Sequence, residues 1–477
     1  MANLKEKLCF PVFELIGQAA DEAALETYVV GGFVRDTVMK RPCKDIDIVT
    51  IGSGIQLAEK LQEKIGKGSK ISVFRNFGTA MLHFREKEED WQVEFVGARK
   101  ESYSHDSRKP VVEDGTLEDD QNRRDFTINA MAICLNQNRY GELTDPFDGC
   151  SDIKKQIIRT PLDPDITFSD DPLRMLRAIR FATQLDFSIH PNTFEAIKRN
   201  AYRIEIVSME RNIDEINKMM LSAHPSMGFR LLDKSGLLEI LFPELVKLKG
   251  TTSVGERTHK DNFKHTLEVL DNISKKSDDL FLRWAAVLHD IGKPYCKRYD
   301  EKTGFSFHGH ELKGSRMVKP IFRRLKLPLN EKMKYVEKLV SLHLRPIVLA
   351  EDIVTDSAVR RLIFDAGDDI DDLMLLCQAD ITSKNSYKVK QYMHNFEIVR
   401  QKMLEIEEKD RVRNFQPPVC GEEIMRIFDL APCKEIGVLK NTVKDAILDG
   451  IIPNEKQAAL DLLYSEAKKL GLKPHEQ

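Results

Sequence analysis

Two aspartates at strand spacing are the most chemically suggestive feature of the chain. They lie in the segment Asp45-Ile46-Asp47-Ile48, and alternate residues of a β-strand face the same side. Both carboxylates would then project together, with Ile46 and Ile48 filling the core behind them. Carboxylates this close repel each other unless a cation lies between them, and Mg²⁺ prefers carboxylate and phosphate oxygens. The pair therefore predicts a two-metal centre that activates an attacking hydroxyl and neutralises a pyrophosphate leaving group.

A glycine turn precedes the acidic pair. Gly31 and Gly32 end a predicted strand and begin a helix that carries Arg35 in its first turn. Glycines let the backbone approach a ligand, the helix start offers free N–H groups to an anion, and Arg35 could clamp a phosphate. Considered alone, each feature has a plainer interpretation. The turn would be an ordinary helix start, and Asp45 and Asp47 would lie on the exposed face of an edge strand. Together they favour a site for the phosphates of a nucleotide.

Further motifs follow in a recognisable order. They are Gly31-Gly32-x-x-Arg35-Asp36, Asp45-x-Asp47, Arg123-Arg124-Asp125-Phe126-Thr127-Ile128-Asn129-Ala130, Asp170-Asp171-Pro172-Leu173-Arg174-Met175-Leu176-Arg177-Ala178-Ile179-Arg180-Phe181 and Ser208-x-Glu210-Arg211. Residues 1–220 therefore resemble the class II CCA-adding tRNA nucleotidyltransferase and bacterial poly(A) polymerase family. The resemblance implies an α+β chain, with a nucleotidyltransferase-type mixed α/β head followed by an all-α body.

The resemblance also implies roles for individual residues. Asp45 and Asp47 would be the catalytic carboxylates that bind Mg²⁺. The nucleotide-binding residues would be Gly32, Arg35, Arg124, Asp125, Asp171, Arg174, Arg177 and Arg180. Among them, Asp125 would read a ribose hydroxyl, and Asp171 and Arg174 would hydrogen-bond the base edge of CTP or ATP. Asp171 and Arg174 are three residues apart and would share a helix face, although a capped helix start with an ordinary ion pair is the plainer alternative.

A polar, breaker-rich stretch separates the head strands from the Arg123-Arg124-Asp125 motif. It runs from Arg99 to Pro110 and continues through Gly115–Asp120, and its composition predicts a mobile loop. It resembles the flexible loop that family members need to switch from C addition to A addition. Complete CCA addition to tRNA, using CTP and ATP, is therefore the favoured function. An enzyme that adds only A or only CC, and a poly(A) polymerase, remain alternatives.

A second set of residues suggests another metal site. Six of the twelve histidines lie between residues 259 and 343, at His259, His265, His289, His308, His310 and His343. The order His265, His289-Asp290 and Asp380 resembles the HD phosphohydrolase superfamily, which implies a divalent metal bound by these four residues. His310 and His343 could complete a second metal position. The alternatives are an HD fold kept as a scaffold, and a phosphohydrolase of RNA-end or nucleotide phosphoesters with a vestigial head.

The elements that must position these residues change in character along the chain. β-Branched and aromatic residues predict strands at Thr27–Val30, Asp45–Thr50, Ile71–Phe74, Thr79–Phe84 and Trp91–Gly97, with Thr127–Leu135 as a strand or helix. Within the predicted strand Trp91–Gly97, Glu94 is expected to face solvent. Helical periodicity then predicts Asp171–Ala182, Pro191–Asn200, Glu210–Leu221 and Met227–Lys234. We predict a head at 1–150, a helical neck at 151–220, a connector at 221–255, an HD domain at 256–385 and a helical tail at 386–477.

Composition narrows the class of protein. Hydrophobic residues make up 42% and charged residues 31%, and no apolar run is long enough to span a membrane. The acidic residues near the start argue against a signal peptide, and eight cysteines without a CxxC pair favour the cytoplasm. The formal net charge of −3 means that any RNA surface must be local. Residues 315–345, with nine Lys or Arg against two Glu, are either a solvated helix face or an RNA-contacting face.

Overall fold

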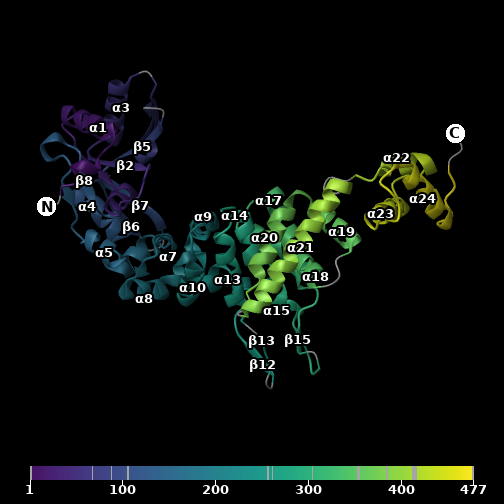
Figure 1. The fold of residues 1–477 in the computed structure, drawn as a ribbon. Helices are drawn as coiled ribbons and strands as arrows, with labels where there is room; N and C mark the ends of the chain where they lie inside the picture. Colours follow the sequence, from purple (N-terminus) through teal and green to yellow (C-terminus); the bar gives the residue numbers. More distant parts are fainter. Residues whose placement is uncertain are drawn as a thin grey trace. The chain divides into compact units, whose positions relative to one another are not determined.

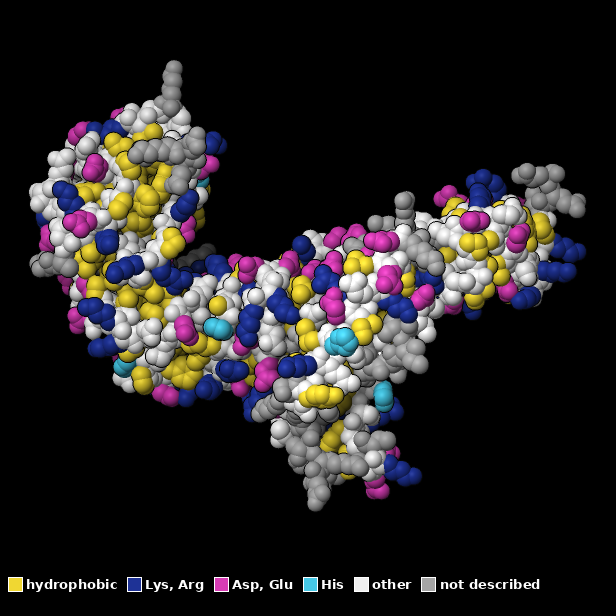
Figure 2. Space-filling model, in the orientation of Figure 1, with side chains coloured by type: hydrophobic (Ala, Val, Ile, Leu, Met, Phe, Trp, Pro, Cys, Tyr) yellow, Lys and Arg dark blue, Asp and Glu magenta, His cyan; other side chains and the backbone are white. Residues whose placement is uncertain are grey.

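The computed structural model describes residues 3–66, 68–86, 89–104, 107–254, 257–259, 261–302, 304–351, 355–382, 385–410 and 416–474. The chain divides into two compact units, Met1–Pro243 and Glu244–Gln477. Figure 1 shows that the large sheet belongs to the first unit and that helices dominate the second. On the face drawn in Figure 2, acidic and basic side chains are interspersed, which agrees with the small net charge.

A seven-stranded mixed sheet forms the head, in the order β3-β4-β5-β2-β1-β8-β9. The strands are β1 (Glu26–Val30), β2 (Ile46–Ile51), β3 (Lys70–Phe74), β4 (Thr79–Glu86), β5 (Glu89–Gly97), β8 (Ala132–Cys134) and β9 (Leu143–Thr144). Strand β2 runs antiparallel to β1 and parallel to β5. The five predicted strands are confirmed, and the ambiguous segment Thr127–Leu135 divides into a 3₁₀ turn, η3 (Thr127–Asn129), and β8.

Two helices and a buried cluster hold the sheet in place. Helices α1 (Pro11–Glu22) and α3 (Gly54–Ile65) pack against each other, and α3 also packs on β4 and β5. Ile46 and Ile48 of β2 are buried, as the strand period predicts. The residues that alternate with these point to the opposite face of β2, where Val49 belongs to a second buried cluster. Asp47 therefore points to the same face as Val49. It lies near the beginning of β2, at the edge of that cluster.

The predicted mobile loop before the Arg123-Arg124-Asp125 motif is instead a β-hairpin. Strands β6 (Arg99–Ser104) and β7 (Ser107–Asp114) pair antiparallel, with Arg99 opposite Asp114 and Lys100 opposite Glu113. Opposite charges that face each other across two strands stabilise the pairing. A loop prediction from polar composition does not take these cross-strand pairs into account. A capping box at Thr116 then starts helix α4 (Leu117–Asn122). His105 and Asp106, within the predicted loop, lie outside the described residues.

Helices α5 (Gly149–Lys155) to α11 (Leu237–Leu241) complete the first unit. The four predicted helices correspond to α7 (Leu173–Leu185), α8 (Pro191–Asn200), α9 (Met209–Met220) and α10 (Pro225–Lys234), and α6 (Pro164–Asp170) precedes them. Helix α7 begins two residues later than predicted. Asp171 is extended, with φ −137° and ψ 97°, because a residue before proline disfavours the α conformation. The side chain of Asp171 is thereby turned toward the start of α7 rather than along it.

The second unit is built on helices, with small strand pairs added. Its helices include α13 (Asn262–Ser274), α14 (Leu280–Leu288), α15 (Lys293–Cys296), α16 (His310–Arg324), α17 (Glu331–Leu342), α20 (Ile370–Asp380), α21 (Ser386–Asp410), α23 (Lys434–Leu448) and α24 (Lys456–Lys469). Two antiparallel pairs, β12–β13 (Thr252–Val254, Arg257–His259) and β14–β15 (Arg298–Asp300, Gly304–Ser306), depart from the all-helical expectation. Trp284 and Phe322 are buried between α14 and α16. Among the described residues, no helix is both long and apolar enough to cross a bilayer.

Candidate functional site

The predicted acidic pair lies at the mouth of a cleft in the first unit. Asp45 precedes β2 and is exposed, and Asp47 is half-buried and pairs in register with Val30 of β1 and Glu94 of β5. Burial raises the pKa of Asp47, and the carboxylate of Asp45 raises it further, against the opposing effect of Arg124. Glu94 is exposed, as expected, yet its pKa is raised by partial burial and by the Asp47 carboxylate. Asp45, Asp47 and Glu94 thus form a cluster of carboxylates, and such a cluster is suited to a divalent cation.

The glycine turn brings the backbone directly against this pair. Gly31 has φ 71° and ψ −135°, a backbone conformation that residues other than glycine rarely adopt. A Cβ atom at this position would lie 3.3 Å from Oδ2 of Asp47 and 3.2 Å from Nη1 of Arg124. Gly31 therefore keeps open the space between the acidic pair and the first turn of helix α2 (Gly32–Val38).

Arg35 projects from α2 into the cleft and is held from two sides. Its Nε and Nη2 atoms donate to the two carboxylate oxygens of Asp36, both at 2.9 Å, and Nη1 donates to Oδ1 of Asn129 at 3.0 Å. Its guanidinium also lies 5.2 Å from the centre of the Phe181 ring. The predicted phosphate clamp is thus fixed in orientation before a ligand arrives.

A buried carboxylate anchors the Arg123-Arg124-Asp125 motif. Asp120 of α4 is fully buried and accepts hydrogen bonds from Nε of Arg123 and Nε of Arg124, both at 3.0 Å. Asp125 accepts from Nδ2 of Asn129 at 3.0 Å and from Nε of Arg177 at 2.7 Å. Burial opposes the charged form of Asp125, but Arg177 and the hydrogen bonds lower its pKa overall, so the carboxylate stays ionised. The motif presents fixed positive and negative groups side by side.

The proposed base-reading pair lies at the start of α7. Oδ1 of Asp171 accepts from the backbone N–H of Leu173 at 3.1 Å, so Asp171 acts as a helix cap as well as lining the cleft. Arg174 donates from Nη2 to the backbone carbonyl of Arg123 at 2.6 Å, which draws its guanidinium toward the Arg123-Arg124-Asp125 motif. The capped helix start and the functional arrangement are therefore compatible in one structure.

One cleft, of about 430 Å³, collects most of the predicted residues. Its walls include Gly32, Arg35, Asp45, Asp47, Arg124, Asp125, Asp171, Arg174 and Arg177. Arg180 is not among the lining residues. Its buried side chain donates from Nε to Oε2 of Glu215 at 2.5 Å and covers the ring of Phe181, with 3.9 Å to the ring centre. Arg180 thus lies behind the cleft wall and supports it, which differs from the expected place in the pocket.

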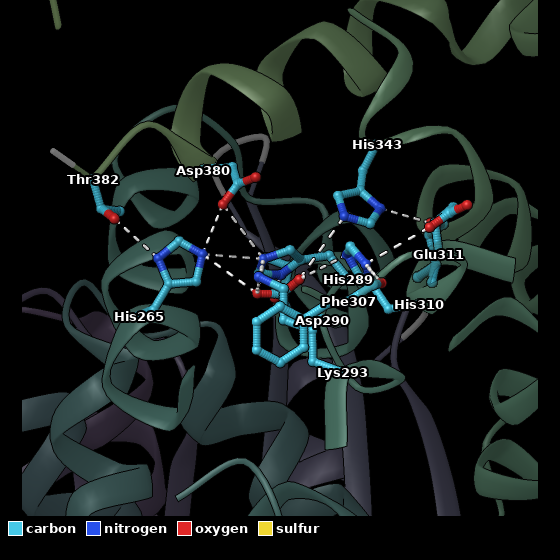
Figure 3. Close-up of polar contacts among 12 residues, drawn as sticks. His265, His289, Asp290, Lys293, Phe307, His310, Glu311, His343, Asp380 and Thr382 are labelled. Atoms are coloured by element: carbon cyan, nitrogen blue, oxygen red, sulfur yellow. Dashed lines mark hydrogen bonds and ion pairs between the residues drawn. The ribbon is translucent and has the colours of Figure 1, made fainter. Parts of the chain in front are cut away.

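The predicted HD residues converge in the second unit (Figure 3). Nδ1 of His289, His310 and His343 donates to the backbone carbonyls of Ala286, Phe307 and Val340 at 2.8, 2.8 and 2.7 Å. These bonds hold each ring with Nε2 directed at the centre of the cluster, where this nitrogen offers a lone pair to a metal whenever the imidazole is neutral. His265 meets them from α13, with Nδ1 2.9 Å from Oγ1 of Thr382. His308 is exposed and apart from the cluster, and the side chain of His259 lies outside the described residues.

Asp290 divides its two oxygens between two sets of imidazoles. Its Oδ2 lies 3.3 Å from Nε2 of His289 and 3.6 Å from Nε2 of His265, and Asp380 joins this set, with Oδ1 2.7 Å from Nε2 of His265. The other oxygen, Oδ1, lies 3.3 Å from Nε2 of His310 and 3.9 Å from Nε2 of His343. Asp290 is therefore placed to bridge two positions, each with at least three ligand atoms within 4.8 Å.

The electrostatics of the cluster fit a bound cation. Among the described residues, Oδ1 of Asp290 and Nε2 of His310 and His343 are buried without a hydrogen-bond partner. Burial lowers the pKa of His343 to about 4, which keeps it in the neutral form that binds metal. Burial also disfavours the charged form of His289, but Asp290 and Asp380 more than offset it and raise the pKa to about 10. The two buried carboxylates thus favour a positive charge at the centre of the cluster, and a metal ion can supply it.

Three family models match the chain. The Poly A polymerase head domain matches residues 27–159, the probable RNA and SrmB-binding site of polymerase A matches residues 186–248, and the HD domain matches residues 262–385. The chain is 33% identical over 353 residues to the A-adding tRNA nucleotidyltransferase of Deinococcus radiodurans, covering 72% of this chain and 78% of the relative. It is 32% identical over 390 residues to the Multifunctional CCA protein of Shewanella frigidimarina, covering 77% and 86%. The chain belongs to the tRNA nucleotidyltransferase family.

Solved structures of CCA-adding enzymes share its fold. The Bacillus stearothermophilus CCA-adding enzyme in complex with CTP aligns with a TM-score of 0.65 at 22% identity, over 97% of this chain and 99% of that one. The Thermotoga maritima CCA-adding enzyme complexed with tRNA aligns with a TM-score of 0.60 at 22% identity, over 98% and 99%. The predicted fold class, a mixed α/β head followed by a helical body with an HD domain, is confirmed. Both the nucleotidyltransferase and the HD families depend on metal ions.

The predicted site residues do not account for every side chain that lines the tRNA nucleotidyltransferase cleft. Arg211, Asn129 and Phe181 line it beside the residues named above. Each falls within a motif that carries the family resemblance, so motif membership was the available signal. The individual roles, Asn129 as a partner of Arg35 and Phe181 as a ring beneath the arginines, depend on contacts between distant segments.

Proposed function

We propose that the chain adds CCA to the 3′ end of tRNA, using CTP and ATP without a nucleic-acid template. The observation that most supports this is one cleft in which Asp45 and Asp47 lie among six arginines. These are Arg35, Arg123, Arg124, Arg174, Arg177 and Arg211. An anionic triphosphate fits such a wall, and the acidic pair, with Glu94 across the sheet, would hold Mg²⁺. When bound, Mg²⁺ activates the 3′-hydroxyl and stabilises departing pyrophosphate.

The residues of the cleft would orient the reactants for one bond exchange. The 3′-oxygen of the RNA forms a bond to the α-phosphorus as the bond from that phosphorus to pyrophosphate breaks. Arg35 would bind the triphosphate, and its existing bonds to Asp36 and Asn129 keep it oriented. Asp171 and Arg174 would offer acceptors and donors to the base. Cytosine and adenine both present an amino group beside a ring nitrogen acceptor, so the same pair serves both.

The test is incorporation of labelled CTP and ATP into three tRNAs. One ends at the unpaired base before CCA, one ends after the first C, and one ends after CC. We expect three, two and one additions on these substrates, each stopping at CCA, and none with Asp45→Ala. A long A ladder would show a poly(A) polymerase instead. Incorporation that survives Asp45→Ala would refute the assignment of the acidic pair.

A narrower activity is the second candidate. The relative from Deinococcus radiodurans, at 33% identity, is an A-adding enzyme. The same three substrates separate the two functions, because an A-adding enzyme extends only the tRNA that already ends in CC. Extension of the substrate without CC therefore excludes an A-adding enzyme, and incorporation of the final A separates complete CCA addition from an enzyme that adds only CC.

For the second unit, we propose a metal-dependent phosphohydrolase that acts on phosphoesters at RNA ends. The observation behind it is the shared Asp290, with a buried, unpartnered oxygen facing His310 and His343. His265, His289, Asp290 and Asp380 would hold one divalent ion, and Asp290, His310 and His343 a second. A bound ion lowers the pKa of a water ligand so that it can attack phosphorus. Asp290→Ala should abolish hydrolysis of a 2′,3′-cyclic phosphate while CCA addition continues, and the reverse holds for Asp45→Ala.

The cellular setting follows from the substrates. All eight cysteines are free, which suits a reducing compartment. We propose that the enzyme acts in the cytoplasm on tRNA. Fractionation of cells, followed by detection of the CCA-adding activity, would test this.

A further inference from the structure

Helix α16 has two chemically different faces. At its first residue, the buried His310 contributes to the metal cluster. Lys313 follows one turn later, and Arg316, Lys319 and Arg323 continue from it onto the opposite side of the helix; all four side chains are exposed. They recur every three or four residues and so form one row, here called the α16 cation row, that extends along about 15 Å of helix. The row begins within one turn of the cluster and leads away from it.

The α16 cation row is not neutralised by nearby acids. Within the part of the chain that the structure describes, Arg316, Lys319 and Arg323 have no acidic partner within 4.0 Å, whereas neighbouring Arg324 is paired with Glu244. Other cations of the unit do have acidic partners, such as Lys338 with Asp369. Uncompensated cations in a regular row attract a polyanion, because binding releases the counterions of its phosphates.

An aromatic platform connects the α16 cation row to the metal cluster. Helix α15 begins at Lys293, whose Nζ lies 2.5 Å from Oδ2 of Asp290. Two residues later, the ring of Tyr295 is 47% exposed. Lys313 approaches the ring at 5.5 Å from its centre, and Lys247 at 5.3 Å, with Nζ of Lys247 also 3.1 Å from the Tyr295 hydroxyl. A half-exposed ring flanked by ammonium groups offers a surface for stacking a base and binding its phosphate.

We propose that Tyr295 and the α16 cation row bind the single-stranded 3′ segment of an RNA and deliver its terminal phosphoester to the metal cluster. The inference deepens the phosphohydrolase proposed for the second unit and, for the hydrolytic step, rests on it. The terminal nucleotide lies at Lys293 and Asp290, the next base stacks on Tyr295, and the phosphates further along contact Arg316, Lys319 and Arg323. The surface makes the unit selective for polynucleotide ends over free nucleotides, since a mononucleotide reaches the cluster without touching the row.

The test compares two substrates with the full chain and a triple variant. The variant is Arg316→Gln with Lys319→Gln and Arg323→Gln, and none of these residues contacts the metal cluster. The substrates are a short oligoribonucleotide ending in a 2′,3′-cyclic phosphate and the mononucleotide 2′,3′-cyclic AMP. We expect kcat/KM for the oligonucleotide to fall about 10- to 100-fold and its salt dependence to weaken by about two in the log–log slope, since about 0.7 is lost per single-strand contact. Hydrolysis of the mononucleotide should not change.

A matched triple variant controls for net charge. Lys434→Gln with Lys440→Gln and Lys468→Gln removes the same charge from exposed positions on α23 and α24. Equal losses in the two triple variants, or equal losses for the two substrates, would overturn the proposal.

A binding readout separates this surface from the hydrolase activity itself. An oligoribonucleotide carrying 4-thiouridine next to its 3′ end should photocrosslink to Tyr295, as mapped by mass spectrometry. Crosslinks at Tyr295 without any hydrolysis would refute the hydrolase and support the RNA surface. Absence of crosslinks from both α15 and α16 would refute the surface, whatever the activity.

Discussion

Asp47 on β2 lies directly across the sheet from Glu94 on β5, and the Asp47 carboxylate, together with partial burial, raises the pKa of Glu94. The two residues are register partners on neighbouring strands, so their side chains emerge on the same face of the sheet, with Asp47 lining the cleft and Glu94 outside its lining. The acidic pair that sequence spacing predicts is therefore a trio in space. A third oxygen donor would stabilise a cation that two carboxylates hold only in part.

We expect Glu94→Gln to reduce CCA addition on the order of 100-fold, because a neutral amide withdraws one charge from the cation site. Nucleotide binding measured without divalent metal should be unaffected. Asp90→Asn, which removes the same charge from an exposed position on the same strand, serves as the control for surface charge. A Glu94→Gln enzyme with full activity would show that Asp45 and Asp47 suffice.

Gly31→Ala should be more damaging than its cost in backbone strain. Alanine at φ 71° destabilises the fold by about 1–3 kcal/mol, and its Cβ would also press on Asp47 and Arg124. Gly78→Ala is a matched control, because Gly78 has φ 62° but open space around its Cβ position. Gly31→Ala should lose more stability in urea unfolding, because its ψ of −135° lies outside the left-handed region that Gly78 occupies, and only Gly31→Ala should lose CCA addition by an order of magnitude or more. Equal activities would show that the turn does not shape the site.

The Arg180–Glu215 pair behind the cleft should contribute strongly to stability. Both side chains are buried, so Glu215→Gln leaves a buried guanidinium without its counter-charge, which costs about 3–5 kcal/mol. The exposed Arg199–Asp165 pair is a control, and Asp165→Asn should cost no more than about 1 kcal/mol. Urea unfolding followed by Trp91, in a Trp284→Phe background, reports on the first unit. A Glu215→Gln loss as small as that of Asp165→Asn would contradict the expectation.

Metal removal should destabilise the second unit selectively. Without a cation, the cluster must keep positive charge on His289 beside two carboxylates and leave three buried atoms unsatisfied. Chelation should therefore lower the Tm reported by the fluorescence of Trp284 in a Trp91→Phe variant, and added Mn²⁺, Co²⁺ or Ni²⁺ should restore it. In His310→Ala with His343→Ala, one position is lost, and metal should raise the Tm less. An unchanged Tm on chelation would indicate that protons alone stabilise the cluster.

Features encoded locally were the ones that sequence could predict. The spacing of Asp45 and Asp47 needs only the strand period. The start of α7 after Pro172 also follows from a local rule, although the predicted helix began two residues earlier, at Asp171. The order of His265, His289, Asp290 and Asp380 carried a family resemblance that the structure turns into one cluster. Their predicted roles in binding a nucleotide or a metal stay predictions until tested.

Features that depend on pairing between distant segments were not accessible. The place of Glu94 requires the β2–β5 register, and the retreat of Arg180 behind the cleft requires Glu215, thirty-five residues away. The β6–β7 hairpin was taken for a mobile loop because its polar composition conceals the cross-strand charge pairs. Composition identifies which residues are polar but not which of them face each other.

The shared carboxylate of Asp290 also sets a charge balance for the proposed HD centre. Its ligands are two carboxylates and four imidazoles, which together carry two negative charges when the imidazoles are neutral. Two divalent cations would bring four positive charges, leaving an excess of two. Lys293 beside Asp290 and Glu311 beside His310 add one charge of each sign, so the excess stays at two and favours the binding of a phosphate anion.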